Sequence, residues 1–450
     1  MNTPICDFVR RYAESSMVRM HMPGHKGTGP LGCEALDITE IHGADSLYEA
    51  EGIIAESEKN ASRLFGCPTF YSTEGSSQCI RAMLYLVTLY ARQQGISRPL
   101  IAAGRNVHKT FLSAAALLDL DVQWLYPDAD NSYLSCDITE ETLERFLSCS
   151  DRLPAAIYVT SPDYLGNMLD LSKLSNLCHR HGVLLLVDNA HGAYLKFLPG
   201  SQHPMDQGVD LCCDSAHKTL PVLTGGAYLH IAVNAPGLFA EQAKSALALF
   251  GSTSPSYLIL QSLDAANAIL DSSSYRNQLA ALVSQITSCR KQLTNQGFKV
   301  AQDNEPLKLT IQPKLYGYDG TEVADYLRQQ SIECEFADPD FLVLMLTPAI
   351  TAEDLHRLTN VLTALPRRSA ILTTPPKIGH PQKVLSIRES IFSPCKTLPA
   401  AECSGKILAT ASVGCPPAVP IVICGERIDS NAISCFQYYG IESCNVIDQQ

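Results

Sequence analysis

The feature that most constrains the fold is an alternation, between about residues 60 and 235, of helical stretches with short apolar runs. Runs of this length and composition are typical of strands buried on both faces of a parallel sheet. With helices between them, they predict βαβ units and an α/β fold. The predicted strands are Leu100–Ala103, Ala155–Thr160, Val183–Val187, Leu211–Cys213 and Ala227–Val233, with helices such as Gln78–Gln94 and Leu171–His181 between them.

A second pattern begins near residue 270 and indicates a smaller α+β domain. Thr351 and Asp354 have the spacing of a capping box at the start of a helix. The paired prolines Pro375 and Pro376 favour extended backbone and therefore a linker. The elements predicted before the capping box are a helix at Ser274–Gln296, a strand at Leu307–Gln312, a helix at Thr321–Gln330 and a strand at Phe341–Leu346. The predicted domain order is an N-terminal segment 1–20, a large domain 21–270, a small α+β domain 271–366, a linker 367–384 and a C-terminal α+β domain 385–450.

The composition restricts the expected partners. The 450 residues carry a formal net charge of -12 and no Lys/Arg-rich stripe, so nucleic acid is not an expected partner. The longest aliphatic runs, such as Val183–Val187, are far too short to span a bilayer, so no membrane partner is expected. The 17 cysteines are scattered without a CxxC pattern, which is typical of reduced thiols, and we expect a cytoplasmic location.

Lys218 stands in the densest cluster of chemically active residues. It lies just after the predicted strand Leu211–Cys213, at the end of a strand where open parallel sheets place their ligand crevice. With Ser215 and His217 beside it, Lys218 fits an imine-forming amine next to phosphate-binding groups. The spacing alone is equally compatible with a surface lysine.

Asp188 follows the aliphatic strand Val183–Val187 directly. An acid at the carboxyl end of a buried strand requires a partner, and a pyridinium N–H is one, because the carboxylate keeps the ring nitrogen protonated. The same side chain is also suited to bind a metal or to cap the next helix.

Two further segments point to the same edge of the predicted sheet. Gly75, Ser76 and Ser77 precede an amphipathic helix, whose N-terminus suits a phosphate; the alternative is that a serine is only the N-cap. His108 follows the strand Leu100–Ala103, where an imidazole can stack on an aromatic cofactor. A lone histidine is more often a structural residue.

Two apparent motifs are set aside. Gly27–Gly32 matches G-x-G-x-x-G, but no strand precedes it and Pro30 interrupts it. His21 and His25 have the spacing of a helical metal pair, but Pro23 and Gly24 break any helix there. No metal site is therefore predicted.

Three N-terminal segments complete a resemblance that runs along nearly the whole chain. They are His21–Gly27 (HMPGHKG), Gly43–Leu47 (GADSL) and Glu51–Ile54 (EGII). Together with Ser215–Lys218 and Asp188–Gly192, they resemble the ornithine/lysine/arginine decarboxylase family, particularly its short bacterial members without an N-terminal wing domain. The resemblance implies an aspartate-aminotransferase-like fold of type I and the cofactor pyridoxal 5'-phosphate (PLP).

The resemblance also implies roles for individual residues. Lys218 would carry the Schiff base, Asp188 would pair with the pyridine nitrogen, and His217 or Lys218 would return a proton to the substrate's Cα. The remaining roles are phosphate contacts from Gly75, Ser76, Ser77, Ser215 and His217, ring contacts from His108 and Ala190 on opposite faces, and a place near the substrate carboxylate for His191.

The activity implied is decarboxylation of arginine, lysine or ornithine to an amine and CO2, for polyamine synthesis or acid resistance. Thr253–Tyr257 resembles a family element near the dimer interface, so a homodimer or higher homo-oligomer is expected. The alternatives are a PLP-dependent aminotransferase or lyase, and a catalytically silent PLP-binding relative. Two departures from the family pattern bear on substrate identity: Asn189 where close relatives often have Glu, and Cys415–Pro420 where Tyr-Pro-Pro-Gly-Ile-Pro is usual.

Overall fold

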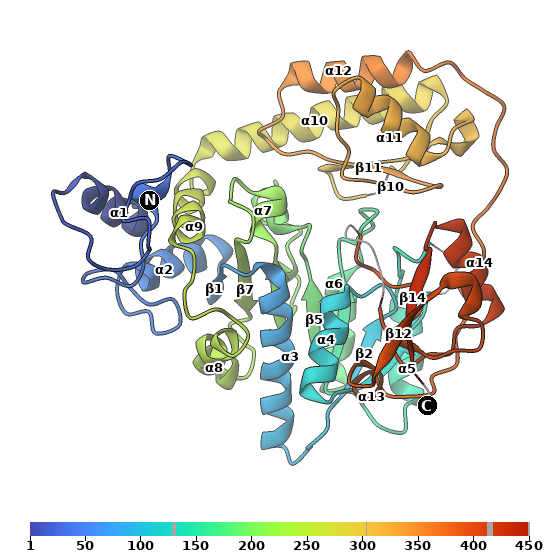
Figure 1. The fold of residues 1–450 in the computed structure, drawn as a ribbon, viewed down its shortest axis with the longest axis horizontal. Helices are drawn as coiled ribbons and strands as arrows, with labels where there is room; N and C mark the ends of the chain where they lie inside the picture. Colours follow the sequence, from blue (N-terminus) through green and yellow to red (C-terminus); the bar gives the residue numbers. More distant parts are fainter. Residues whose placement is uncertain (128–131, 303, 412–416, 449–450) are drawn as a thin grey trace. The chain divides into compact units, whose positions relative to one another are not determined.

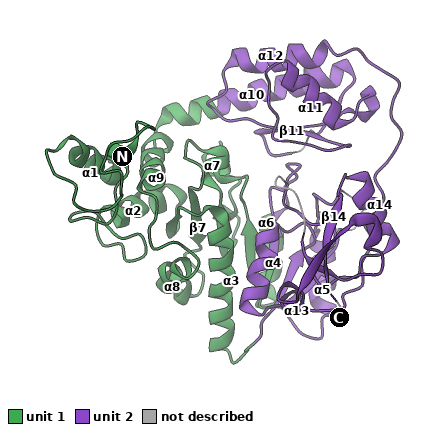
Figure 2. Ribbon diagram, viewed as in Figure 1, with its two compact units in different colours: residues 1–97, 155–157, 171–279 green, residues 98–154, 158–170, 280–450 purple. Residues whose placement is uncertain are grey.

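The computed structural model describes residues 1–127, 132–302, 304–411 and 417–448 (Figure 1). Contacts between residues divide the chain into two compact units (Figure 2). Unit 1 comprises Met1–Ser97, Ala155–Ile157 and Leu171–Leu279, and unit 2 comprises Arg98–Pro154, Tyr158–Asp170 and Ala280–Gln450.

A seven-stranded sheet with the strand order β1-β7-β6-β5-β4-β2-β3 is the main β element. Its pairs β5–β6 and β2–β3 are parallel, whereas β7 is antiparallel to both β6 and β1. The predicted α/β class with a mainly parallel sheet is thus confirmed. The strands are β1 (Thr69–Ser72), β2 (Leu100–Gly104), β3 (Asp121–Leu125), β4 (Ala156–Thr160, which the division into units cuts), β5 (Leu184–Asp188), β6 (Leu211–Asp214) and β7 (Ala227–Ile231).

Helices cover the part of the sheet that belongs to unit 1. α3 packs beside α8, and α1 packs against α2 and α9 (Figure 1). α6 packs against β5, whose five residues are all buried, as the continuous apolar run predicts. The helices are α1 (Pro4–Glu14), α2 (Ile53–Phe65), α3 (Gly75–Gln93), α6 (Leu171–Arg180), α7 (Ala216–Thr219), α8 (Gly237–Ala248), α9 (Tyr257–Leu270) and the first turns of α10 (Ser273–Gln296).

Most predicted elements in this region lie within a few residues of their observed bounds. β1 was not predicted, because four residues are too few to show a period. β7 ends at Ile231 rather than Val233. It runs antiparallel because only the short segment between Asp214 and Ala227 joins it to β6, and that segment is not the long helical crossover that a parallel pair usually needs.

Unit 2 contains two further antiparallel sheets, with the orders β10-β11-β9-β8 and β12-β14-β13. The capping box predicted before α12 is present, since the Thr351 hydroxyl accepts from Asp354 N at 3.1 Å and Asp354 Oδ2 accepts from Thr351 N at 3.0 Å. The remaining elements are α4 (Lys109–Leu118), α5 (Glu140–Cys149), β8 (Lys299–Val300), β9 (Lys308–Gln312), α11 (Gly320–Gln329), β10 (Phe336–Ala337), β11 (Leu342–Met345), α12 (Ala352–Thr363), α13 (Ile387–Ile391), β12 (Cys395–Pro399), β13 (Leu408–Thr410), α14 (Ser430–Tyr438) and β14 (Ser443–Ile447). The domain boundaries proposed above stay predictions, and Cys415 and Pro416 lie outside the described residues.

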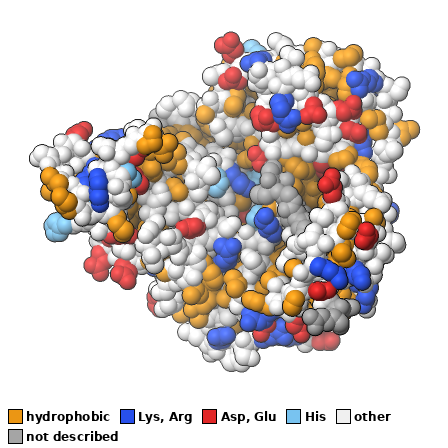
Figure 3. All heavy atoms as spheres, in the orientation of Figure 1, with side chains coloured by type: hydrophobic (Ala, Val, Ile, Leu, Met, Phe, Trp, Pro, Cys, Tyr) orange, Lys and Arg blue, Asp and Glu red, His pale blue; other side chains and the backbone are white. Residues whose placement is uncertain are grey.

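Three further features concern helix hydropathy, the cysteines and the surface charge. In the described part of the chain, no helix is both long and apolar enough to cross a membrane. The cysteines that the structure describes are free thiols, most of them buried. Charged side chains of both signs are scattered over the face drawn in Figure 3.

The buried β5 strand gives a stability prediction. Leu185 is fully buried, so Leu185→Ala removes apolar contacts and leaves a cavity, which should cost about 2 to 5 kcal/mol of unfolding free energy. Urea unfolding followed by circular dichroism measures this loss. Leu249→Ala is the matched control, because Leu249 is 58% exposed in the same unit and should change stability by less than about 0.5 kcal/mol. Equal losses in both variants would contradict the burial of β5.

Candidate functional site at the carboxyl ends of β5 and β6

The two densest sequence motifs meet where β5 and β6 end, within unit 1. Asp188 pairs with Cys213 in the parallel register, and Asn189 N donates to Cys213 O at 3.0 Å just beyond it. The segment after β5 therefore lies beside the segment after β6. This is the crevice position expected for an α/β sheet.

Lys218 is half-buried and faces the segment that follows β5. It belongs to the short helix α7, which starts directly after Ser215. Its Nζ lies 2.9 Å from Nε2 of His191, a side chain that is only 5% exposed. The interpretation of Lys218 as a solvent-exposed surface lysine is wrong. A contact of this length requires a proton between the two nitrogens, so the amine and the imidazole form one proton-sharing pair.

Asp188 is a buried carboxylate at the same edge. Its Oδ1 accepts from Ala190 N at 3.2 Å and from the Cys213 thiol at 3.7 Å. Burial raises the pKa of Cys213 well above its ordinary value, so this thiol stays protonated and can donate. The alternative that Asp188 caps the next helix is wrong, because Gly192 is the N-cap of the short helix Ala193–Phe197.

The N-terminus of α3 lies beside Ser215. The Ser215 hydroxyl donates to Ser76 Oγ at 2.8 Å, which joins the two predicted phosphate-binding segments. The helix begins at Gly75 with Glu74 as N-cap, so the alternative that Ser76 or Ser77 is the N-cap is wrong. Gly75 has a φ of +71°, and a Cβ built there would meet nothing within 4 Å. Open space thus adjoins a helix N-terminus, where an anion is favoured.

His217 is held by the turn before β7. Because a carbonyl oxygen only accepts, the contact of 3.0 Å to Gly226 O places a proton on His217 Nδ1. Burial lowers the pKa of His217 from its ordinary value of 6.5, the bond to Gly226 opposes this change, and the charge of Lys218 adds to it. The net pKa is lowered, so His217 is neutral at pH 7 with Nε2 available as an acceptor.

His108 and the histidine pair set aside above lie elsewhere. His108 lies in unit 2 and is the N-cap of α4, where its Nδ1 accepts from Thr110 N at 3.2 Å; its ring-stacking role stays a prediction. His21 contacts Tyr12, whereas His25 contacts Asp37, so they share no common partner in these contacts.

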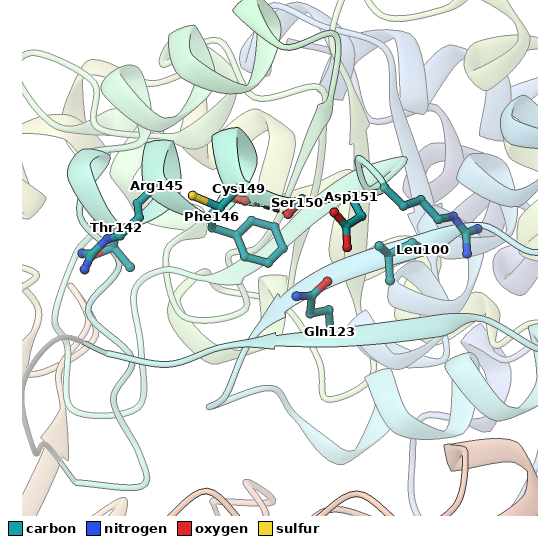
Figure 4. A pocket seen from close by; sticks show the side chains of 9 residues that line it. Leu100, Gln123, Thr142, Arg145, Phe146, Cys149, Ser150 and Asp151 are labelled. Carbon is teal, nitrogen blue, oxygen red and sulfur yellow. Dashed lines mark hydrogen bonds between the residues drawn. The ribbon is translucent and has the colours of Figure 1, made fainter.

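A hollow of about 510 Å³ in unit 2 is a second candidate for a site. It is lined by residues around α5 such as Thr142, Arg145 and Cys149, and none of the predicted site residues lines it (Figure 4). Its lining contains neither a lysine nor a histidine. We therefore place the site at the ends of β5 and β6.

Sequence reasoning missed a buried polar cluster beneath these loops. Asp214 accepts a hydrogen bond of 2.6 Å from Asn189 Nδ2 and contacts of 3.0 Å from Nε2 of both His203 and His230. The four residues come from separate stretches of the chain, so no local spacing marks them as a group. The departure at Asn189 was the only sequence signal.

The chain matches characterised proteins along most of its length. The family model described as Orn/Lys/Arg decarboxylase, major domain, matches residues 3–315. The arginine decarboxylase of Bacillus subtilis (strain 168) is 30% identical in an alignment covering 96% of this chain and 92% of that protein. The structure of the Francisella novicida lysine decarboxylase LdcF aligns with a TM-score of 0.81 at 18% identity, covering 99% of this chain and 81% of that one. An SPT with PLP aligns with a TM-score of 0.55 at 14% identity, covering 69% and 75%.

These similarities establish the fold and the family of the chain. Its architecture is that of fold-type-I PLP enzymes, as the similarities to the lysine decarboxylase and the SPT show. The chain belongs to the Orn/Lys/Arg decarboxylase family, so the resemblance read from the sequence motifs is confirmed.

The environment of His217 gives a prediction for its titration. Because its pKa is lowered by burial, the imidazole should take up its proton at a pH below 6.5, with the midpoint read from its ring-proton NMR signal. Assignment by His217→Gln, which removes the signal, serves as the control. A midpoint above 6.5 would mean that His217 is charged near neutral pH and would contradict its assignment as an acceptor.

Proposed function

We propose that this chain is a PLP-dependent decarboxylase of a basic amino acid, with arginine as the first candidate substrate. The observation that carries the proposal is the contact of 2.9 Å between Lys218 Nζ and His191 Nε2, at the same strand ends as the buried Asp188. A half-buried amine that shares a proton with an imidazole is suited to covalent chemistry on an aldehyde. Family membership supplies the reaction class.

The residues at this edge fit PLP on chemical grounds. Lys218 would hold the aldehyde carbon, and the buried Asp188 would hold the pyridine N–H, since a hydrogen bond from that group to a buried carboxylate is charge-assisted. Ser76, Ser215 and the open space at Gly75 would hold the phosphate. Ala190, which is half-buried, would lie against the ring, and Ser77 and His217 complete the proposed set.

When bound, PLP supplies an electron-withdrawing ring that stabilises charge at the substrate's Cα. The chain's own residues would do the rest. The Lys218–His191 pair can store a proton and return it to Cα after CO2 has left, because the two nitrogens are close enough to share it. The near-complete burial of His191 would keep water from the substrate carboxylate, which favours loss of that group.

Arginine is placed first because relatives of nearly the same length carry the name arginine decarboxylase, in Bacillus subtilis and in Halalkalibacterium halodurans, each at 30% identity. Lysine and ornithine are the other candidates in the family's name. A homo-oligomer, a cytoplasmic location and a role in polyamine synthesis or acid resistance remain part of this proposal. Transamination, another lyase reaction and a silent PLP-binding role are the competing functions.

The test is release of labelled CO2. Incubation with carboxyl-labelled arginine, lysine and ornithine should release label from arginine fastest, without any added keto acid. Lys218→Ala should lower the rate at least ~100-fold, because it removes both the covalent anchor and a proton donor. Lys196→Ala is the matched control, since Lys196 pairs with Asp206 instead and should leave turnover unchanged.

Other outcomes separate the competing functions. Release of label only when a keto acid is present, or retention of label in a keto product, would favour an aminotransferase. A protein that holds PLP yet releases no label from any of the three substrates would favour the silent relative. Full turnover by Lys218→Ala would contradict the assignment of the lysine.

A further inference from the structure

The segment that carries Asp188 and His191 is tied to the end of β6 by a buried side-chain bond. Asn189 Nδ2 donates to Asp214 Oδ1 at 2.6 Å, and neither side chain is exposed to solvent. Asn189 follows Asp188 directly, and Asp214 directly precedes Ser215. This side-chain bond adds to the backbone bond from Asn189 N to Cys213 O, and both join the two segments that present the proposed cofactor ligands.

Asp214 is held as an anion by its surroundings. Burial alone would raise the pKa of Asp214, but the adjacent His203 and His230, which both direct a ring N–H at it, bring it below its ordinary value. The pKa of His230 is raised above its ordinary value. Burial alone would lower it, but the charge of Asp214 and the hydrogen bond to it have the larger effect. A charged acceptor makes the bond from Asn189 stronger than one between two neutral groups.

The proton positions explain why this cluster is an ion pair rather than a metal site. His203 Nδ1 accepts from Met205 N at 3.3 Å, so its proton is on Nε2 and points at Asp214. The hydroxyl of Thr69 donates to Cys67 O at 3.1 Å, so its oxygen accepts from His230 Nδ1 at 2.9 Å. His230 then has protons on both ring nitrogens, and its positive charge balances Asp214.

We propose that Asp214 is a positioning residue that fixes Asp188 and His191 for cofactor binding through its hydrogen bond to Asn189. The inference rests on the proposed function, because it concerns the same cofactor site. It also explains the amide at position 189, where the family resemblance led us to expect Glu. A second carboxylate there would lie against Asp214 with no water between them, and two such acids cannot both be ionised.

The test changes the amide at position 189 to an acid, and then exchanges the acid and the amide between positions 189 and 214. Asn189→Asp places two carboxylates face to face and should raise the dissociation constant for PLP at least tenfold, measured on the purified holoprotein by dialysis and visible absorbance. The double variant Asn189→Asp with Asp214→Asn exchanges acid and amide. The oxygen of the amide introduced at position 214 can accept from both histidines while its nitrogen donates to the new carboxylate, so PLP affinity and the visible circular dichroism band should return to within about threefold of the parent.

A second measurement separates positioning from general stability. Asp210→Asn is the control, because Asp210 is also a buried acid, lies next to the opposite end of β6 and pairs with His179. It should shift the thermal midpoint without altering the cofactor's visible bands. If Asn189→Asp does not fold, Asn189→Ala removes the donor without adding charge and should still weaken PLP binding in a folded protein.

The outcomes are distinct from those of the proposed function. If the parent protein holds no PLP, the proposed function fails and the inference falls with it. If the parent holds PLP and Asn189→Asp retains the parent's affinity and spectrum, positioning by Asp214 is overturned while the proposed function stands. Failure of the double variant to regain PLP affinity while it is folded would equally overturn the pairing.

Discussion

The hydrogen bond from Asn189 N to Cys213 O is the contact on which the site depends. It continues the parallel pairing of β5 and β6 by one residue, so two loops that are far apart in the sequence begin side by side. Each loop then carries one half of the chemistry, with the acid and imidazole of Asp188 and His191 on one and Lys218 on the other. The distance between these two loops is set by β5 and β6, whose residues are all buried. Close packing of the buried strands keeps that distance fixed.

Four buried polar side chains beneath this edge are stabilised by charge and hydrogen bonds rather than by apolar packing. Asp214 is ionised because His203 and His230 donate to it, and it in turn fixes the amide of Asn189. A buried charge left without such partners would cost several kcal/mol, on the order of the whole stability margin of a domain. The cluster and the loop that carries Asn189 are thus energetically linked, because removing the Asn189 amide would leave the buried Asp214 without one of its hydrogen-bond donors.

Sequence patterns predicted much of this architecture because the responsible forces act over short stretches of chain. β5 and α6 were placed from apolar runs and helical periodicity, and the N-terminus of α12 from a capping box, each within a residue or two. Contacts that depend on the tertiary fold were not predictable in this way. The bond from Ser215 to Ser76 and the cluster around Asp214 both join residues that are far apart in the sequence, so no local pattern marks them.

The proposed function requires Lys218 to bind the cofactor covalently. Borohydride converts a reversible lysine–PLP linkage into a stable amine, so the purified protein can be reduced, digested and mapped by peptide mass spectrometry. The phosphopyridoxyl group should appear on the peptide containing Lys218 and on no other lysine. A PLP-loaded protein whose label maps to a different lysine, or whose Lys218 peptide remains unmodified, would contradict it.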